Sequence, residues 1–265
     1  GIYCKKCGLE LEDNIIRKGY GARADARKPV QLPEVIFKID SKKELYALKL
    51  GLKHNKLTHD WSKLLGFKLK NDWIKKEYKD KVLELIKKAF DNNKNKLLDS
   101  KTRIRNKWEN ISNVYFVEME KLLDYNWQSR RFYCYLSMVC NGGFHNSSHD
   151  FIIIQFRWEK LSNYVIAHEL FHIIFRKYID RFFREDYDDF DEELADTIVN
   201  FILLASPKLK ELFPEISFSK EVFKLEKHKN LARKLYPLWK KKKDFKSFLL
   251  NSYKKFDRNK TWISY

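Results

Sequence analysis

The sequence predicts an α+β protein, in which a small mixed sheet is accompanied by mostly helical additions at both ends. Residues 151–156 read FIIIQF, a short β-branched run between polar loops that is typical of a buried strand. Residues 71–92 and 101–123 carry large apolar side chains at helical spacing. Residues 164–175 are apolar at all but three positions, which favours a buried helix.

These signals divide the chain into four segments. Further strands are expected at 35–39 and 131–138, and a second helix is expected at 191–204. Ser41 is expected to cap a helix and Pro207 to end one, and further short helices are expected to break near Pro214 and Pro237. The segments are an irregular Cys-containing stretch (1–40), a helical region (41–110), a mixed unit (111–205) and a basic helical region (206–265).

Composition limits the class of protein. Apolar residues make up 44% of the chain, enough for a packed core, and the formal net charge is +18. No apolar run approaches the eighteen or so residues of a membrane span, and no signal-peptide pattern opens the chain. We therefore expect a soluble, cytoplasmic protein that does not bind membranes.

The three polar positions of the 164–175 helix form an HExxH motif. His168 and His172 lie one helical turn apart on the same face, and Glu169 lies beside them. Burial of a carboxylate and two imidazoles in an apolar helix is costly unless something compensates them. A zinc ion would do so, because two neutral imidazoles bind it and the glutamate contacts a water molecule that the metal activates.

A third zinc ligand is expected from the 191–204 helix. Glu192 and Asp196 are four residues apart and share one face of that helix. Glu193 is a competing ligand, offset by one residue. Without the two upstream histidines, the simpler interpretation would be the solvated stripe of an amphipathic helix. A third histidine ligand six residues after His172 is excluded, since that position is Tyr178.

Over residues 133–204, the pattern HExxH followed by ExxxD resembles the gluzincin metallopeptidases, in particular small single-domain archaeal and bacterial predicted zinc proteases. The resemblance implies a zincin-like catalytic unit and a zinc metalloendopeptidase with a protein or peptide substrate. It also implies that His168, His172 and Glu192 are the zinc ligands and that Asp196 supports a ligand histidine. Glu169 would be the general base.

Two further roles follow from the resemblance. An oxyanion stabiliser is expected downstream, and Tyr178, Tyr187 and His228 are the candidates. An edge strand upstream of the helix is expected to bind substrate, with residues 141–145 as the candidate rim. A plain hairpin loop explains those residues equally well.

The four cysteines suggest a second metal. Cys4 and Cys7 resemble half of a zinc ribbon, and Cys134 and Cys140 could complete a structural four-thiolate zinc site. Buried core thiols are the simpler interpretation of the second pair.

Charge leaves other functions open. Residues 185–196 contain eight acids and no base. This acidic segment would favour substrates with basic residues near the scissile bond. Two alternatives are that it docks on the chain's own basic helices or that it binds a structural calcium ion. The excess of lysine elsewhere suggests an alternative function: a nucleic-acid-associated protein, or a protease acting on nucleic-acid-bound or regulatory proteins, with a structural or latent zinc site. In a latent form of the enzyme, Cys4 or Cys7 could occupy the fourth coordination position of the zinc.

Overall fold

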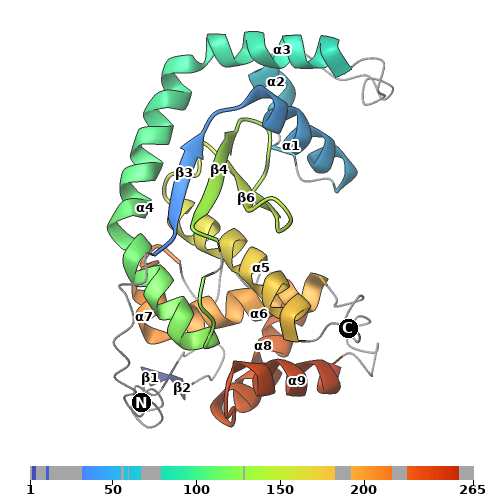
Figure 1. Cartoon of the computed structure of the whole chain (residues 1–265). Coiled ribbons are helices and arrows are strands. Elements are labelled where there is room, and N and C mark those ends of the chain that lie inside the picture. The colour runs from blue at the N-terminus through green and yellow to red at the C-terminus, as the bar shows by residue number, and fades with distance from the viewer. Residues whose placement is uncertain are drawn as a thin grey trace. The chain divides into compact units, whose positions relative to one another are not determined.

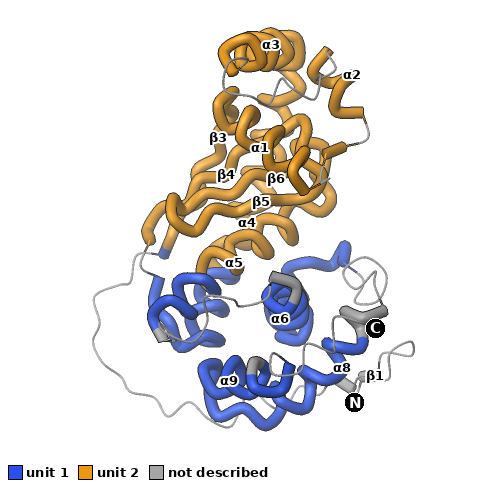
Figure 2. Tube along the Cα trace, turned by 90° about the vertical axis from the view of Figure 1, so that its right-hand side faces the viewer, with its two compact units in different colours: residues 1–32, 114–128, 175–265 blue, residues 33–113, 129–174 orange. Residues whose placement is uncertain are grey.

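The structure of the chain is a computed structural model. It describes residues 2–3, 10–11, 32–54, 57–58, 60–66, 79–127, 129–182, 192–216 and 226–256. It has two compact units (Figure 2). One unit comprises Pro33–Asn113 and Ser129–Ile174, and the other comprises Gly1–Leu32, Val114–Gln128 and Phe175–Tyr265. The predicted mixture of helices with a small mixed sheet is confirmed in the described residues.

The unit Pro33–Asn113 with Ser129–Ile174 contains a four-stranded sheet in the order β3-β4-β6-β5 (Figure 1 and Figure 2). Its strands are β3 (Glu34–Lys38), β4 (Arg131–Ser137), β5 (Gly143–Asn146) and β6 (Phe151–Gln155). β3 and β6 both run parallel to the central β4, whereas β5 pairs antiparallel with β6. The strands expected from β-branched runs therefore form, and β5 is the outer strand next to β6.

The burial of each strand matches its sequence. All five residues of β6 are buried, as expected for a continuous apolar run in a strand covered on both faces. β4 alternates instead, with Phe132, Cys134 and Leu136 buried and the residues between them more exposed. Among β4, β5 and β6, strand β5 is the least buried, and Phe144 is its one buried residue.

The first four helices of the described chain begin in the same unit: α1 (Ser41–Lys53), α2 (Trp61–Leu65), α3 (Lys79–Asn92) and α4 (Lys94–Leu123). The prediction that Ser41 caps α1 is wrong by one residue. Asp40 is the N-cap, and its carboxylate accepts hydrogen bonds from the backbone N–H groups of Lys42 and Lys43. A carboxylate is a strong N-cap acceptor because it also complements the helix dipole.

A polar anchor fixes the loop that leads into α5 (Ser162–Phe182). Arg103 of α4 donates to both carboxylate oxygens of Glu159, at 2.9 and 2.7 Å. Ser100 donates to the same carboxylate at 3.2 Å, and Lys107 donates to the Glu159 carbonyl at 2.9 Å. These bonds tie the start of α5 to α4 three residues before the helix begins.

The other unit is mainly helical. It contains α6 (Glu192–Ala205), α7 (Pro207–Glu211), α8 (Glu226–Lys240) and α9 (Phe245–Phe256), together with the short strands β1 (Ile2–Tyr3) and β2 (Glu10–Leu11). α6 ends before Pro207 as predicted, and Pro207 then starts α7. The break expected near Pro237 comes three residues later, because α8 continues through Pro237 and ends at Lys240. Pro237 lies in the last turn of this helix.

Aromatic side chains fill the core of this second unit. Phe201 of α6 lies 6.0 Å from Trp239 and 6.4 Å from Phe248, measured between ring centroids. Phe201 and Phe248 are fully buried and Trp239 nearly so. These three aromatic residues are therefore core residues of the unit.

None of the helices in the described ranges is both long and apolar enough to span a lipid bilayer.

Candidate metal centre

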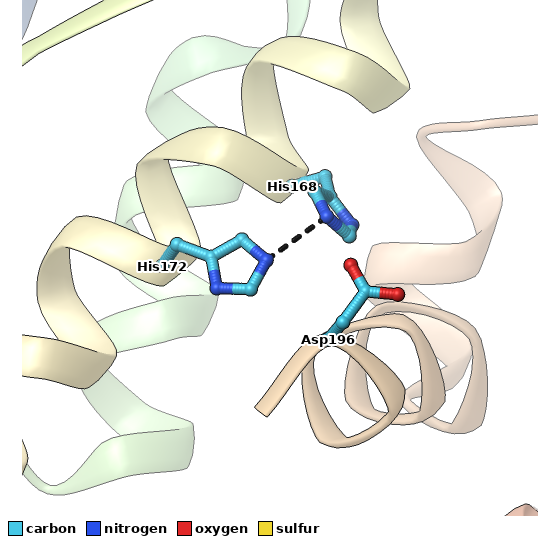
Figure 3. A group of neighbouring side chains, drawn as sticks. All are labelled: His168, His172 and Asp196. Carbon is cyan, nitrogen blue, oxygen red and sulfur yellow. Dashed lines mark hydrogen bonds between the residues drawn. The ribbon is translucent and has the colours of Figure 1, made fainter. Parts of the chain in front are cut away.

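Two imidazole side chains of helix α5 point toward each other. His168 and His172 are separated by one turn, and their Nε2 atoms lie 3.0 Å apart (Figure 3). Both rings are half-buried, while the flanking Ala167, Leu170 and Phe171 are fully buried. The apolar faces of α5 thus fix the helix, and the two histidines share the face that is left partly open.

The distance between these nitrogens fits a shared zinc ion. Zinc–nitrogen bonds of about 2.0–2.1 Å in a tetrahedral site place two ligand nitrogens about 3.3 Å apart. The observed 3.0 Å is close to that value. A proton shared between the two rings is the competing explanation for so short a separation. Metal content distinguishes the two.

Glu169 lies beside the pair and is held by the outer strand. Its side chain is buried, and its Oε2 atom lies 2.9 Å from Nδ1 of His145 on β5. Burial opposes ionisation of Glu169. The hydrogen bond from His145 and the charges of His168, His145 and His172 outweigh that effect and lower the pKa of the carboxyl group. Glu169 is therefore a carboxylate with a defined orientation.

Figure 3 draws a third side chain with the two histidines, that of Asp196 on α6. The atoms of His168, His172 and Asp196 that can bind a metal all lie within 4.8 Å of one another. Two nitrogens and one carboxylate oxygen are a usual zinc ligand set. Asp196 also accepts a hydrogen bond of 3.2 Å from the Asn200 side chain.

The predicted ligand Glu192 is the first residue of α6, four residues before Asp196. Its side chain, and that of the competing Glu193, lie outside the described part of the structure. The assignment of Glu192 as ligand, and of Asp196 as the carboxylate that supports a ligand histidine, therefore remains a prediction. The proximity of Asp196 adds a second candidate for the third ligand.

Of the three residues predicted to stabilise an oxyanion, Tyr178 is the one whose side chain lies in the described part of the structure. Tyr178 is buried, and its ring packs against Tyr125 and Phe245 at 5.7 and 5.1 Å between centroids. Burial raises the pKa of the Tyr178 hydroxyl. Tyr187 and the side chain of His228 lie outside the described residues, as does most of the acidic segment 185–196.

The sequence predicts that the four cysteines could form a second, structural zinc site, and the structure describes two of them. Cys4 and Cys7 lie outside the described residues. Cys134 and Cys140 are both buried free thiols, and Cys140 donates a hydrogen bond of 3.1 Å to the Gly142 carbonyl. Burial raises the pKa of the Cys134 thiol, which opposes formation of the thiolate that binds zinc. This pair accordingly has the surroundings of core thiols.

The sequence does not predict the contact between His145 and Glu169, although it offers residues 141–145 as a candidate substrate rim. A weak signal was present. Gly143 and His145 are two apart on a strand and so point to the same face, here the face toward α5. That a histidine on this face meets Glu169 depends on the packing of β5 against α5.

Comparison of the sequence with protein-family models, and of the chain with curated proteins and solved structures, finds no match.

Proposed function

We propose that this chain is a zinc-dependent peptidase that uses Glu169 as its general base. The observation that carries the proposal is the convergence of the His168 and His172 Nε2 atoms to 3.0 Å beside a buried carboxylate. Few arrangements other than a metal site place two imidazoles and a carboxylate together on one otherwise apolar helix.

His168 and His172 would hold the zinc, together with a carboxylate of α6. The described geometry offers Asp196 for that position, and the resemblance to gluzincins offers Glu192. When bound, zinc supplies a Lewis acid that acidifies a water molecule and polarises the scissile carbonyl.

Glu169 would accept a proton from the attacking water and deliver it to the leaving amine. Its lowered pKa keeps it ionised at neutral pH, which is the form that can accept a proton. Because Oε2 is engaged by His145, Oε1 is the oxygen that remains for this transfer. The bond broken is the peptide C–N bond, and no covalent intermediate with the protein is required.

The test combines metal content with hydrolysis. Wild-type protein is expected to contain one zinc at this centre and to cleave members of a mixed library of quenched fluorescent peptides. Glu169→Gln should retain the zinc and lose hydrolysis, whereas His168→Ala and His172→Ala should lose both. Hydrolysis by Glu169→Gln at the wild-type rate would disprove the mechanism, and absence of zinc from wild type would disprove the site.

A second candidate function is the binding of nucleic acid, and it is favoured by the helices α8 and α9. Residues 230–256 contain one acid, Asp244, and nine bases. Eight of the bases are exposed, namely Arg233, Lys234, Lys240, Lys241, Lys243, Lys246, Lys254 and Lys255. Such a concentration of positive charge attracts the phosphate backbone.

Nucleic-acid binding is tested by fluorescence anisotropy with labelled single- and double-stranded oligonucleotides. If the basic helices bind phosphates, the logarithm of affinity should fall linearly with the logarithm of salt concentration. Lys240→Glu/Lys241→Glu/Lys243→Glu should then weaken binding and reduce that slope by about 3. Unchanged affinity in the triple variant would exclude this surface. Peptidase activity, if present, should be unaffected by it.

A further inference from the structure

His145 joins two members of the proposed site. Its Nδ1 atom lies 2.9 Å from Glu169 Oε2, and its ring stacks on that of His172. The two ring centroids are 4.6 Å apart and the planes are inclined by only 7°. One side chain of the outer strand β5 therefore contacts both the proposed base and a proposed zinc ligand on α5.

The hydrogen bond has a defined direction. An ionised carboxylate can only accept, so the proton must be on Nδ1 of His145. Free neutral histidine has no partner that fixes this tautomer, and here Glu169 supplies one. The bond leaves the other oxygen of Glu169 without this restraint and fixes the plane of the carboxylate.

Gly143 makes this approach possible. A Cβ atom on Gly143 would meet Oε1 of Glu169 first, and it would lie 2.6 Å from Cγ and 2.7 Å from Cδ, far inside van der Waals contact. The absence of a side chain lets β5 approach α5 closely enough for His145, two residues further along the same face, to reach the carboxylate. Gly143 and His145 thus act together: the glycine allows the close approach of β5, and the histidine makes the contact with Glu169.

We propose that His145 is a positioning residue that orients the Glu169 carboxylate for proton transfer. This inference rests on the proposed function, since it concerns the same site. His145 acts through Glu169, and its bond to Oε2 leaves Oε1 as the proton acceptor. A carboxylate without this bond would sample other rotamers, and the fraction of molecules with a correctly placed base would fall.

Two substitutions separate the hydrogen bond from the ring stack. His145→Phe retains a flat ring against His172 but removes the donor. His145→Asn retains an N–H donor near the position of Nδ1 but removes the ring. If orientation of Glu169 is the role, His145→Phe should lower kcat about tenfold to a hundredfold with KM changed less than about twofold. His145→Asn should recover most of the lost kcat.

Zinc affinity distinguishes a role in orienting Glu169 from a merely structural role at the metal site. Measured by competition with a chromogenic chelator, the zinc Kd of His145→Phe should stay within about threefold of wild type, because the ligands are intact. Wild-type kcat in His145→Phe would overturn the proposal. Equal losses of kcat in the Phe and Asn variants would also overturn it, since the donor would then not matter.

A measurement on metal-free protein tests the contact without any activity. Nitrogen-15 NMR of histidine rings distinguishes the tautomers, and the His145 signals are identified by their loss in His145→Asn. Wild type should show the proton on Nδ1, and Glu169→Ala should shift it toward Nε2. If both proteins show the Nε2 tautomer, the contact does not exist.

The two proposals fail in different ways. If wild type binds no zinc and cleaves nothing, the proposed function fails, whatever the NMR shows. If wild type is active, Glu169→Gln is inactive and His145→Phe has full activity, then the peptidase proposal stands and the role of His145 is wrong.

Discussion

Gly143 and Glu169 are in direct contact across the strand–helix interface, with no room for even a methyl group between them. The glycine is on the outer strand β5 and the glutamate is in the middle of α5. Because β5 is paired to β6 on one side, it cannot move away from α5 without loss of its strand hydrogen bonds. The side chain at 143 therefore decides where the Glu169 carboxylate can lie.

Gly143→Ala should displace Glu169 and lower peptidase activity by at least about tenfold, while the protein stays folded with a stability loss of about 1–3 kcal/mol. The reason is overpacking against a buried side chain. Steady-state kinetics and thermal unfolding measure both effects. Ser148→Ala, at an exposed position just after the strand and outside the 141–145 rim, is the control and should be unchanged. Full activity in Gly143→Ala would show that the contact is absent in solution.

Asp196→Asn and Glu192→Gln together should identify the third zinc ligand. Each variant keeps the size of the side chain and removes the charge that binds zinc. The true ligand should show the larger loss of zinc affinity, and the supporting carboxylate a loss of about tenfold to a hundredfold. Chelator competition measures both. Unchanged affinity in both variants would exclude a carboxylate of α6 from these two positions and direct attention to Glu193.

Glu44 should make the protein less stable as the pH rises. Its side chain is buried, and Oε1 accepts a hydrogen bond of 2.9 Å from the Met138 N–H, while Oε2 has no protein partner in the described residues. Burial raises the pKa of Glu44 to about 7 from 4.5. Between those values the native state binds more protons than the unfolded state. Stability therefore falls with rising pH, by about 3 kcal/mol in total.

Glu44→Gln removes this titration and keeps the acceptor for Met138. Its unfolding free energy, measured by urea denaturation from pH 4.5 to 8, should depend on pH less steeply than that of wild type. Glu84→Gln, which changes an exposed carboxylate on α3, is the matched control and should follow the wild-type curve. Parallel curves for wild type and Glu44→Gln would contradict the buried acid.

Glu159→Gln should destabilise the protein by about 1 kcal/mol at neutral pH, because the variant loses the charged two-bond contact with Arg103. The hydrogen bond from Arg103 lowers the pKa of Glu159 below 4.5, so its contribution is present above that pH and is lost as the pH falls. The difference in urea midpoint between variant and wild type should therefore shrink at acidic pH.

The exposed pair Arg105–Glu109 on the same helix provides the comparison for that experiment. Its charged atoms are 3.6 Å apart and both side chains are about half exposed or more. Glu109→Gln should change the unfolding free energy by less than about 0.5 kcal/mol. An equal effect at the two positions would show that Glu159 does not anchor the start of α5.

Local sequence patterns predicted much of the fold. The 101–123 stripe lies in α4, the β-branched run became β6, and the apolar stretch with HExxH became α5. These predictions succeeded because alternation and helical spacing are set by each element's own geometry. The cap of α1 is one residue from the predicted Ser41, and α8 ends three residues after Pro237, because neighbouring groups at a helix end compete for the same role.

The sequence by itself placed His168 and His172 on one helix face with Glu169 beside them, since spacing along one helix needs no information beyond the helix. Their environment depended on the tertiary structure. The approach of Gly143 and the contacts of His145 join residues more than twenty positions apart, and those positions come together through the pairing of β5 with β6 and its packing on α5. Spacing within one helix is fixed by backbone geometry, whereas the meeting of two elements is fixed by packing, which a single sequence does not display.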